Sequence, residues 1–196
     1  MKEIKFDIIK FAYIEKETPD VSFIPMLLRR KLNSFGRAAI YTLYKSFENE
    51  NVNLVFSSDY GDFERVKKLV KQRKEEGEIS PTGFSFSVHN ASVGLFSLLE
   101  KIKTGYNSVS AGKDSLPYGF LEGILSSAKI PALYCYTESL EKLQSVSVLI
   151  SQNPNGKYLL SENNTGSSLN GFSDFIKFLE GEKDSFSCDL YSVKRI

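Results

Sequence analysis

The clearest pattern in the chain is the stretch Ser80-Pro81-Thr82-Gly83-Phe84-Ser85-Phe86-Ser87-Val88-His89-Asn90-Ala91-Ser92-Val93-Gly94-Leu95-Phe96-Ser97-Leu98-Leu99. Phe84, Phe86 and Val88 alternate with polar residues, which predicts a short strand over residues 84–88. From Ala91 onward apolar residues recur at helical spacing, and Asn90 is suited to cap the first turn. The stretch therefore predicts a strand that enters a helix abruptly, an elbow at which many α/β enzymes place a nucleophile.

The elbow carries the only histidine of the chain and no cysteine. The partial positive charge of a helix N-terminus would stabilise an anion or lower the pKa of a thiol. The position therefore suits acyl chemistry but lacks the thiol that would perform it. The residues that occupy this elbow are His89, Asn90, Ala91 and Ser92.

Composition limits the classes of function. With 196 residues and a formal net charge of +1, we expect one domain over residues 1–196 and no attraction to nucleic acid. No apolar run approaches the roughly 20 residues that a membrane-spanning helix needs. Cys135 and Cys188 lie far apart in apolar segments, which predicts reduced core thiols and a cytoplasmic location. Because soft ligands are few and no glycine motif matches a phosphate-binding loop, we expect no metal and no cofactor.

Strands and helices are expected to alternate along the chain. This order predicts an α/β fold with a mixed, mainly parallel sheet flanked by helices and antiparallel additions at the C-terminus. The additions include a hairpin around residues 153–156, where Asn-Gly favours a tight turn. Strands are expected at 4–14, 51–58, 84–88, 107–112, 130–137, 145–152, 157–161 and 188–193. Helices are expected at 27–47 with a break near 34–36, and at 62–76, 90–105, 116–128 and 171–180.

Several stretches together resemble the N-terminal half of β-ketoacyl synthases, which have the thiolase fold. The most similar subgroup is the ketosynthase-like proteins of aryl-polyene-type and related type II fatty acid or polyketide systems. The resemblance spans roughly residues 24–137, and the run 84–94 is its most specific part. The matching stretches are residues 24–37, 55–62 and 80–94, with weaker matches at 108–112 and 119–122.

The resemblance implies a half-thiolase fold without its chemistry. In active ketosynthases the elbow carries a nucleophilic cysteine, and two histidines from the C-terminal half complete the site. This chain has neither at the matching positions, and few residues follow Thr137. It therefore resembles a truncated, cysteine-less member of the chain length factor type. By resemblance, it is a non-catalytic accessory subunit that pairs with a full-length ketosynthase in fatty acid or polyketide chain elongation.

Two other functions stay open at this point. One is a stand-alone protein that binds an acyl chain or another small ligand. The other is a minimal thioesterase or hydrolase that uses His89, although no G-x-S-x-G elbow surrounds Ser92. His89 and Asn90 fit equally well a remnant site that contacts an acyl chain, or a helix cap beside a buried, hydrogen-bonded imidazole.

Partners are expected from the resemblance and from one basic helix. Family members dimerise through the strand before the elbow, which places a dimer interface at Phe84, Phe86 and Val88. The partner would be a full-length ketosynthase, and otherwise a second copy of this chain. Acyl carrier proteins are acidic, so the basic helix after Asp62 is a candidate docking surface or an ordinary solvated face. Its candidate docking residues are Arg65, Lys68 and Lys71.

Overall fold

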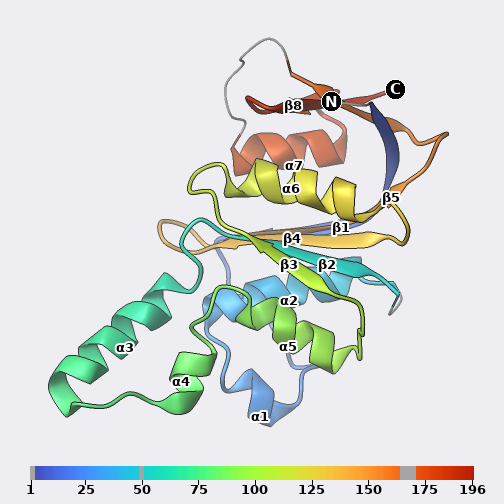
Figure 1. The fold of residues 1–196 in the computed structure, drawn as a ribbon. Helices are drawn as coiled ribbons and strands as arrows, with labels where there is room; N and C mark the ends of the chain where they lie inside the picture. Colours follow the sequence, from blue (N-terminus) through green and yellow to red (C-terminus); the bar gives the residue numbers. More distant parts are fainter. Residues whose placement is uncertain (1–2, 49–50, 164–170) are drawn as a thin grey trace.

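A single mixed sheet organises the molecule. The computed structural model describes residues 3–48, 51–163 and 171–196. Within them, eight strands form one sheet in the order β3-β2-β4-β5-β1-β6-β8-β7 (Figure 1). The strands are β1 (Ile4–Glu15), β2 (Asn53–Ser57), β3 (Tyr106–Val109), β4 (Ala132–Glu138), β5 (Gln144–Gln152), β6 (Tyr158–Glu162), β7 (Ser185–Ser187) and β8 (Tyr191–Arg195).

The sheet contains fewer parallel pairs than the sequence suggests. β2 is parallel to β3 and to β4, whereas every other neighbouring pair is antiparallel. The predicted mixed sheet flanked by helices is confirmed. Its antiparallel part is larger because the long first strand enters the sheet between β5 and β6.

The predicted hairpin over residues 145–161 is therefore wrong, although its turn is real. Gly156 N–H donates to the Asn153 carbonyl at 2.8 Å, so the chain does reverse there. However, Phe6 of β1 pairs with Gln152 on one side and with Tyr158 on the other. The turn thus passes around the end of β1, and no local signal reveals that a strand from the N-terminus lies between its two arms.

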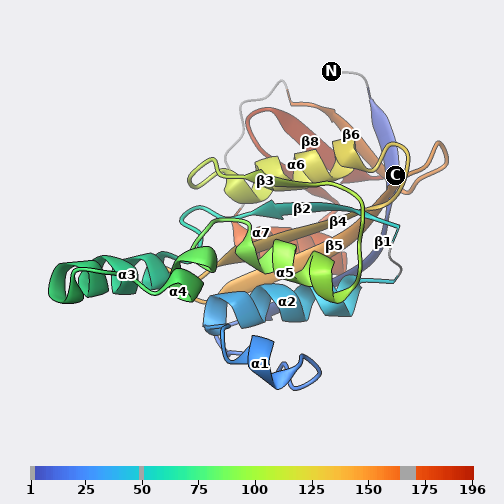
Figure 2. The ribbon, with the colours of Figure 1, turned by 60° about the horizontal axis from the view of Figure 1, so that its bottom comes forward.

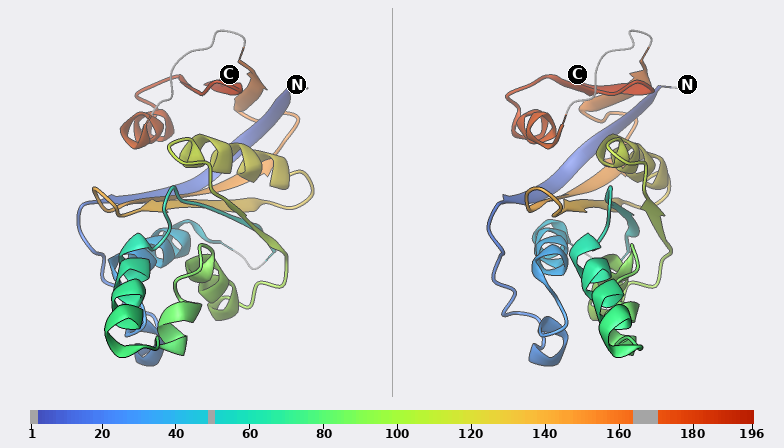
Figure 3. Two further views of the ribbon diagram at one scale, coloured as in Figure 1. Left: turned by 60° about the vertical axis from the view of Figure 1, so that its left-hand side comes forward. Right: turned by 90° about the vertical axis from the view of Figure 1, so that its left-hand side faces the viewer.

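Seven helices surround the sheet within the described residues. α2 and α5 cover one face, and α6 and α7 lie on the other, where β6, β8 and β7 bend over α7 (Figures 1 and 3). Their bounds are α1 (Met26–Arg29), α2 (Ser34–Ser46), α3 (Phe63–Glu76), α4 (Pro81–Ser85), α5 (Ala91–Leu99), α6 (Ser115–Ser126) and α7 (Phe172–Glu180). None of the described helices is both long enough and apolar enough to cross a bilayer.

Strand periodicity divides the core into two layers. In β4, Leu133 and Cys135 pack toward α2 and α5, while Tyr134 and Tyr136 pack toward α6 and α7. This alternation follows from the pleat of a strand that is covered on both faces. Cys135 and Cys188 are both free and buried, as the sequence predicts.

Helices α3 and α4 form an arm that projects from this body (Figures 1 and 2). α3 has no buried residue along its whole length. Its bounds agree with the predicted helix over residues 62–76. Asp62 accepts a hydrogen bond from Arg65 N–H at the start, and Gly77 ends the helix at a φ of 79°. The arm is therefore a well-capped helix with little tertiary packing.

The predicted strand over residues 84–88 is wrong. Pro81–Ser85 is the short helix α4, begun by Ser80, whose side chain accepts a hydrogen bond from Gly83 N–H. The Ser85 and Ser87 hydroxyls donate to nearby carbonyls, at 2.9 and 2.8 Å. Serine side chains thus satisfy the backbone locally and compete with strand pairing. The predicted start of the next helix is confirmed, since α5 begins at Ala91.

Candidate functional site

His89 lies at the entry to α5, beside the loop that leaves β2. Its Nε2 is 3.1 Å from the Ser58 carbonyl oxygen, and its ring packs edge-on against Phe56. The next residue, Asn90, caps α5 by position but not by a side-chain bond; its amide donates to the Tyr106 hydroxyl at 3.3 Å. Ser92 is buried. In the described part of the chain His89 and Ser92 share no hydrogen bond, so the two side chains form no dyad.

The true elbow of the sheet lies farther along the chain. β3 runs parallel to β2 and leads through a loop into α6, whose cap position is Asp114. Ser115 Oγ accepts a hydrogen bond from Ala111 N–H at 2.9 Å, which closes the turn. The residues of this elbow include neither cysteine nor histidine. This elbow therefore presents carboxylate and hydroxyl groups and no thiol.

Three carboxylates meet near this elbow at the carboxyl ends of β2 and β4. They belong to Asp59, Asp114 and Glu138. One oxygen each of Asp59 and Asp114 is buried and has no hydrogen-bond partner among the residues that the structure describes. Burial, followed by the negative charge of Glu138 and then of Asp114, raises the pKa of Asp59 to about 6. None of the three carboxylates is among the residues predicted from the sequence. Asp59 closely follows the buried strand β2 and Glu138 ends the buried strand β4, and such strand ends form sites in open sheets, so these two positions carried a signal. Asp114 lies at the cap of α6, after the exposed strand β3.

Glu138 differs from these two, because both of its carboxyl oxygens accept hydrogen bonds. Its Oε2 accepts hydrogen bonds from the Ser58 hydroxyl and from the backbone N–H groups of Asp59 and Tyr60, each at 3.1 Å. Its Oε1 accepts from the N–H groups of Ser139 and Leu140, at 2.8 and 3.2 Å. Five donors compensate the cost of burying this carboxylate, which is 9% exposed.

The three predicted docking residues do not lie together. Arg65 turns back to the body, with Nε 2.7 Å from Asp62 Oδ2 and Nη2 donating to the Lys31 carbonyl at 2.9 Å. Lys68 faces the body across an open pocket, whereas Lys71 lies on the outer side of α3. Lys68 and Lys71 are both exposed, and Lys71 forms an exposed ion pair with Glu75 at 3.8 Å.

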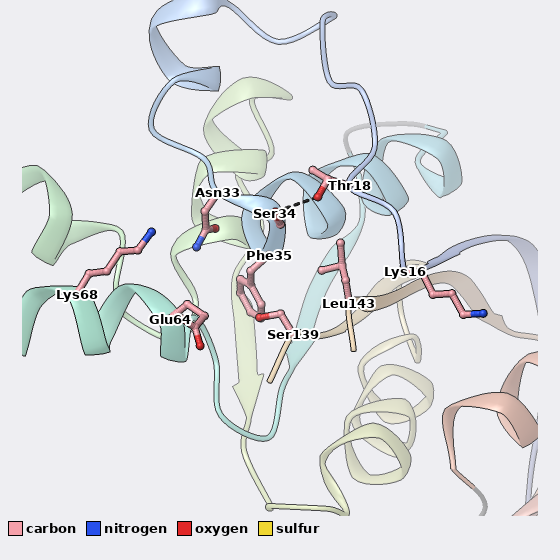
Figure 4. Close-up of a pocket in the computed structure, with 9 residues that line it drawn as sticks. All are labelled: Lys16, Thr18, Asn33, Ser34, Phe35, Glu64, Lys68, Ser139 and Leu143. Atoms are coloured by element: carbon pink, nitrogen blue, oxygen red, sulfur yellow. Dashed lines mark hydrogen bonds between the residues drawn. The ribbon is translucent and has the colours of Figure 1, made fainter. Parts of the chain in front are cut away.

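That open pocket separates α3 from the body. It measures about 350 Å³ and lies between Phe35 at the start of α2, Ser139 after β4, and Glu64 and Lys68 of the arm (Figure 4). The Thr18 hydroxyl donates to Ser34 Oγ at 2.9 Å along its rim. Beyond its base, α3 thus faces the body across space rather than through packed side chains.

The outer side of α3 is apolar. Phe63, Val66 and Val70 follow one another at helical spacing and are 36, 38 and 50% exposed. We call these three residues the arm stripe. They line a groove of about 370 Å³ together with three lysines, Lys67, Lys71 and Lys74. An exposed apolar row framed by charges is typical of a surface that a partner covers.

The predicted interface residues lie on the same arm, but not in a strand. Phe84 in α4 is 57% exposed, and Val88 is also exposed. Phe86 instead packs beneath Lys31 and Arg65, whose charged ends lie 6.0 and 5.7 Å from its ring centre. The free sheet edge on this side is β3, which pairs only with β2. An edge strand of this kind offers unpaired backbone groups to another chain.

Comparison with known proteins agrees with this architecture. The model of the β-ketoacyl synthase N-terminal domain matches residues 8–140, a longer stretch than the 24–137 of the sequence resemblance. No protein with a curated function matches the sequence.

Solved structures of the same fold include complexes of ketosynthases. The complex of the ketosynthase ApeO with its chain length factor ApeC from Xenorhabdus doucetiae matches at a TM-score of 0.76 and 20% identity, covering 98% of this chain and 100% of that one. The ishigamide ketosynthase/chain length factor matches at a TM-score of 0.61 and 10% identity, over 82% of this chain and 68% of that one. The type II acyl-carrier protein complex AntDE:AntF, with its ketosynthase bound to the hexaketide, matches at 0.65 and 12%, over 76% and 63%.

These likenesses establish a thiolase-like fold, and the domain match covers about two thirds of the chain. That match includes the elbow between β3 and α6 and the parallel strands β2 and β4. The chain therefore belongs to the family of the β-ketoacyl synthase N-terminal domain.

Proposed function

We propose that this protein is a non-catalytic accessory subunit that pairs with a full-length ketosynthase, as chain length factors do, in acyl or polyketide chain elongation. The observation that carries the proposal is the arm stripe. Phe63, Val66 and Val70 stand exposed on a helix that contributes nothing to the core of its own chain. A partner surface that covered these side chains would remove apolar area from water, which would stabilise the complex.

The β3 edge supports the same assignment. β3 is the edge strand next to β2, the strand that leads into the arm (Figure 1), and its outer backbone groups suit antiparallel pairing with a second chain. Phe84 and Val88 extend the exposed apolar surface along the arm. In the absence of a ketosynthase, the same surfaces favour a homodimer of this chain.

An acidic acyl carrier protein is a second proposed partner. Lys68 and Lys71 are the exposed residues among the predicted docking residues, and the exposed ion pair of Lys71 with Glu75 is of a kind that contributes little. Arg65 is engaged within the chain. Two free thiols in the core support a reducing compartment, hence the cytoplasm. A hydrolase that uses His89 gains no support, because the imidazole is hydrogen-bonded to the Ser58 carbonyl.

Co-expression tests the pairing. The chain is co-expressed with a full-length ketosynthase of the same organism, and the molar mass of the complex is measured by light scattering after size-exclusion chromatography. We expect a heterodimer, and we expect Val70→Glu to weaken the binding constant more than tenfold because it buries a charge in the apolar contact. The matched control is Leu190→Glu, which replaces a residue of 52% exposure in the turn between β7 and β8.

The control variant should bind as the wild type does. A wild-type chain that stays monomeric at micromolar concentration and does not bind the ketosynthase would remove the accessory-subunit proposal. Equal losses in both variants would show that the arm stripe is not the contact.

A further inference from the structure

The direction of the arm depends on five residues at its base. Residues 58–62, here called the arm base, connect the end of β2 to the start of α3. α3 itself buries no residue, so packing along its length does not hold its angle to the sheet. Whatever fixes the arm base therefore contributes directly to where the arm stripe points.

Glu138 holds the arm base by accepting hydrogen bonds from the Ser58 hydroxyl and from the backbone N–H groups of Asp59 and Tyr60. One carboxylate oxygen accepts from Ser58, Asp59 and Tyr60, while the other accepts from the loop that follows β4. Ser58 Oγ also accepts from Gly61 N–H at 2.8 Å. The carboxylate of Glu138, on a central strand, therefore joins the arm base to the sheet through three direct hydrogen bonds. A fourth bond, from Gly61 N–H, reaches it indirectly through the Ser58 hydroxyl.

His89 fixes the same segment from its carbonyl side. Its Nε2 lies 3.1 Å from the Ser58 carbonyl oxygen. Gly61 adopts a φ of +62°, and a Cβ built there would lie 3.4 Å from His89 Cδ2, in ordinary contact with the ring. The left-handed backbone conformation is what favours glycine at position 61. The imidazole thus acts as a support for the turn.

Asp62 closes the far end of the arm base. Its Oδ1 accepts from Asn33 Nδ2 at 2.7 Å, and its Oδ2 pairs with Arg65. Beyond this point the pocket of about 350 Å³ separates α3 from the body (Figure 4). The arm has further attachments to the body. Arg65 Nη2 donates to the Lys31 carbonyl at 2.9 Å, and Phe86 at the return of the arm packs against the cluster that includes Ile24 and Leu95.

We infer that Glu138, supported by His89, is the positioning residue that holds the arm in its partner-binding direction. This inference rests on the proposed function for its biological role, but the positioning itself is a property of the free chain. Glu138 is suited to this role because all of its five donors are backbone N–H groups or a loop hydroxyl, so it orders two loops at once. Replacing it should loosen the arm without removing any side chain from the hydrophobic core.

Glu138→Gln is the direct test. An amide keeps the size of the side chain but turns one accepting oxygen into a donor, which would face N–H groups. Hydrogen exchange of the free full-length chain should then rise about tenfold over residues 58–76 and stay unchanged in β4 and β5. The matched control is Asp7→Asn, where the carboxylate accepts from Asn153 Nδ2 and Lys157 N–H at the opposite end of the β1–β5 pairing.

Binding to the same full-length ketosynthase provides the second readout. If the oriented arm is populated in only a tenth of the molecules, the apparent dissociation constant rises about tenfold. The control variant Asp7→Asn should bind as the wild type does. Binding of both variants is measured at a temperature at which each is fully folded. A loosened arm with unchanged binding would overturn the inference, and so would unchanged exchange over residues 58–76.

The two failures are distinguishable. If the wild type does not bind the ketosynthase, the proposed function fails while the exchange measurement still decides whether Glu138 positions the arm. Should Glu138→Gln not fold, Ser58→Ala removes one donor to Glu138 and the acceptor of Gly61 N–H. We then expect a smaller rise in exchange confined to the same residues, and no rise there would overturn the inference.

Discussion

At the scale of single residues, close approach between α6 and the sheet depends on Gly119. A Cβ at this position would lie 2.6 Å from Ser57 Cβ and 2.7 Å from Tyr134 Cε2. We expect Gly119→Ala to lower the free energy of unfolding by about 2 kcal/mol, because overpacking outweighs the gain in helix propensity. Urea unfolding measures this loss.

Gly94→Ala provides the contrast, since its nearest neighbour, the Tyr106 hydroxyl, is at an ordinary 3.6 Å. On α5 we expect this substitution to stabilise the protein by about 0.5–1 kcal/mol. Equal effects of the two alanines would show that α6 does not approach the sheet as closely as described.

Asp59 predicts a pH dependence of stability. Burial and the neighbouring carboxylates of Glu138 and Asp114 raise its pKa from 3.8 to about 6. The folded state therefore holds this proton more tightly than the unfolded state does. The favourable contribution is complete below about pH 4 and is lost as the pH rises through 6.

Asp59→Asn should remove this dependence. Because the carboxyl group is only half-buried, solvent screening limits the effect, and we expect the variant to be more stable than the wild type by about 1 kcal/mol at pH 7.5. The two proteins should converge near pH 4. Urea unfolding across this range is the measurement, and a difference that does not vary with pH would contradict the assignment.

At the scale of elements, α3 depends on its caps rather than on packing. Asp62→Ala removes the hydrogen bond to Arg65 N–H, the ion pair with the Arg65 guanidinium and the bond from Asn33. We expect α3 to lose about 1–2 kcal/mol of local stability while the midpoint of global unfolding changes little. Hydrogen exchange over residues 63–76, compared with that in β4, measures this difference.

Glu75→Ala is the control on the same helix, because Glu75 makes only an exposed ion pair with Lys71 at 3.8 Å. Exposed pairs of this kind contribute little. A parallel loss of arm and core stability in Asp62→Ala would mean that the arm unfolds only together with the body.

At the scale of the whole molecule, the chain should not condense acyl groups on its own. Condensation in this family needs an acyl thioester on a reactive cysteine. Burial raises the pKa of the Cys135 thiol to about 11, and burial also raises that of Cys188. Neither thiol is a competent nucleophile, and both should resist alkylation at pH 7.5 until the protein is unfolded in urea.

Incubation of the pure chain with acyl and malonyl carrier-protein substrates should give no ketoacyl product. A complete ketosynthase serves as the positive control. Turnover that persists after replacement of both cysteines and His89 would place a catalytic centre elsewhere in the chain and contradict this prediction.

Local features of the molecule were predictable from neighbouring residues alone. The buried strands β2 and β4, the cap at Asp62 and the start of α5 at Ala91 all lie where the sequence predicts them. Apolar periodicity and helix capping arise from contacts within a few residues, so they can be read along the chain. The family resemblance, carried by short motifs, was recognisable for the same reason.

Relations between distant segments needed the folded chain. Insertion of β1 between β5 and β6, the elbow at β3 and α6, and the bonds from residues 58–60 to Glu138 join parts of the chain separated by many residues. The period-2 pattern at Phe84–Val88 misled because serine hydroxyls in that stretch bond to the backbone locally. Strand order and the satisfaction of a buried carboxylate depend on which backbone groups meet after folding, and no pattern of adjacent side chains encodes that.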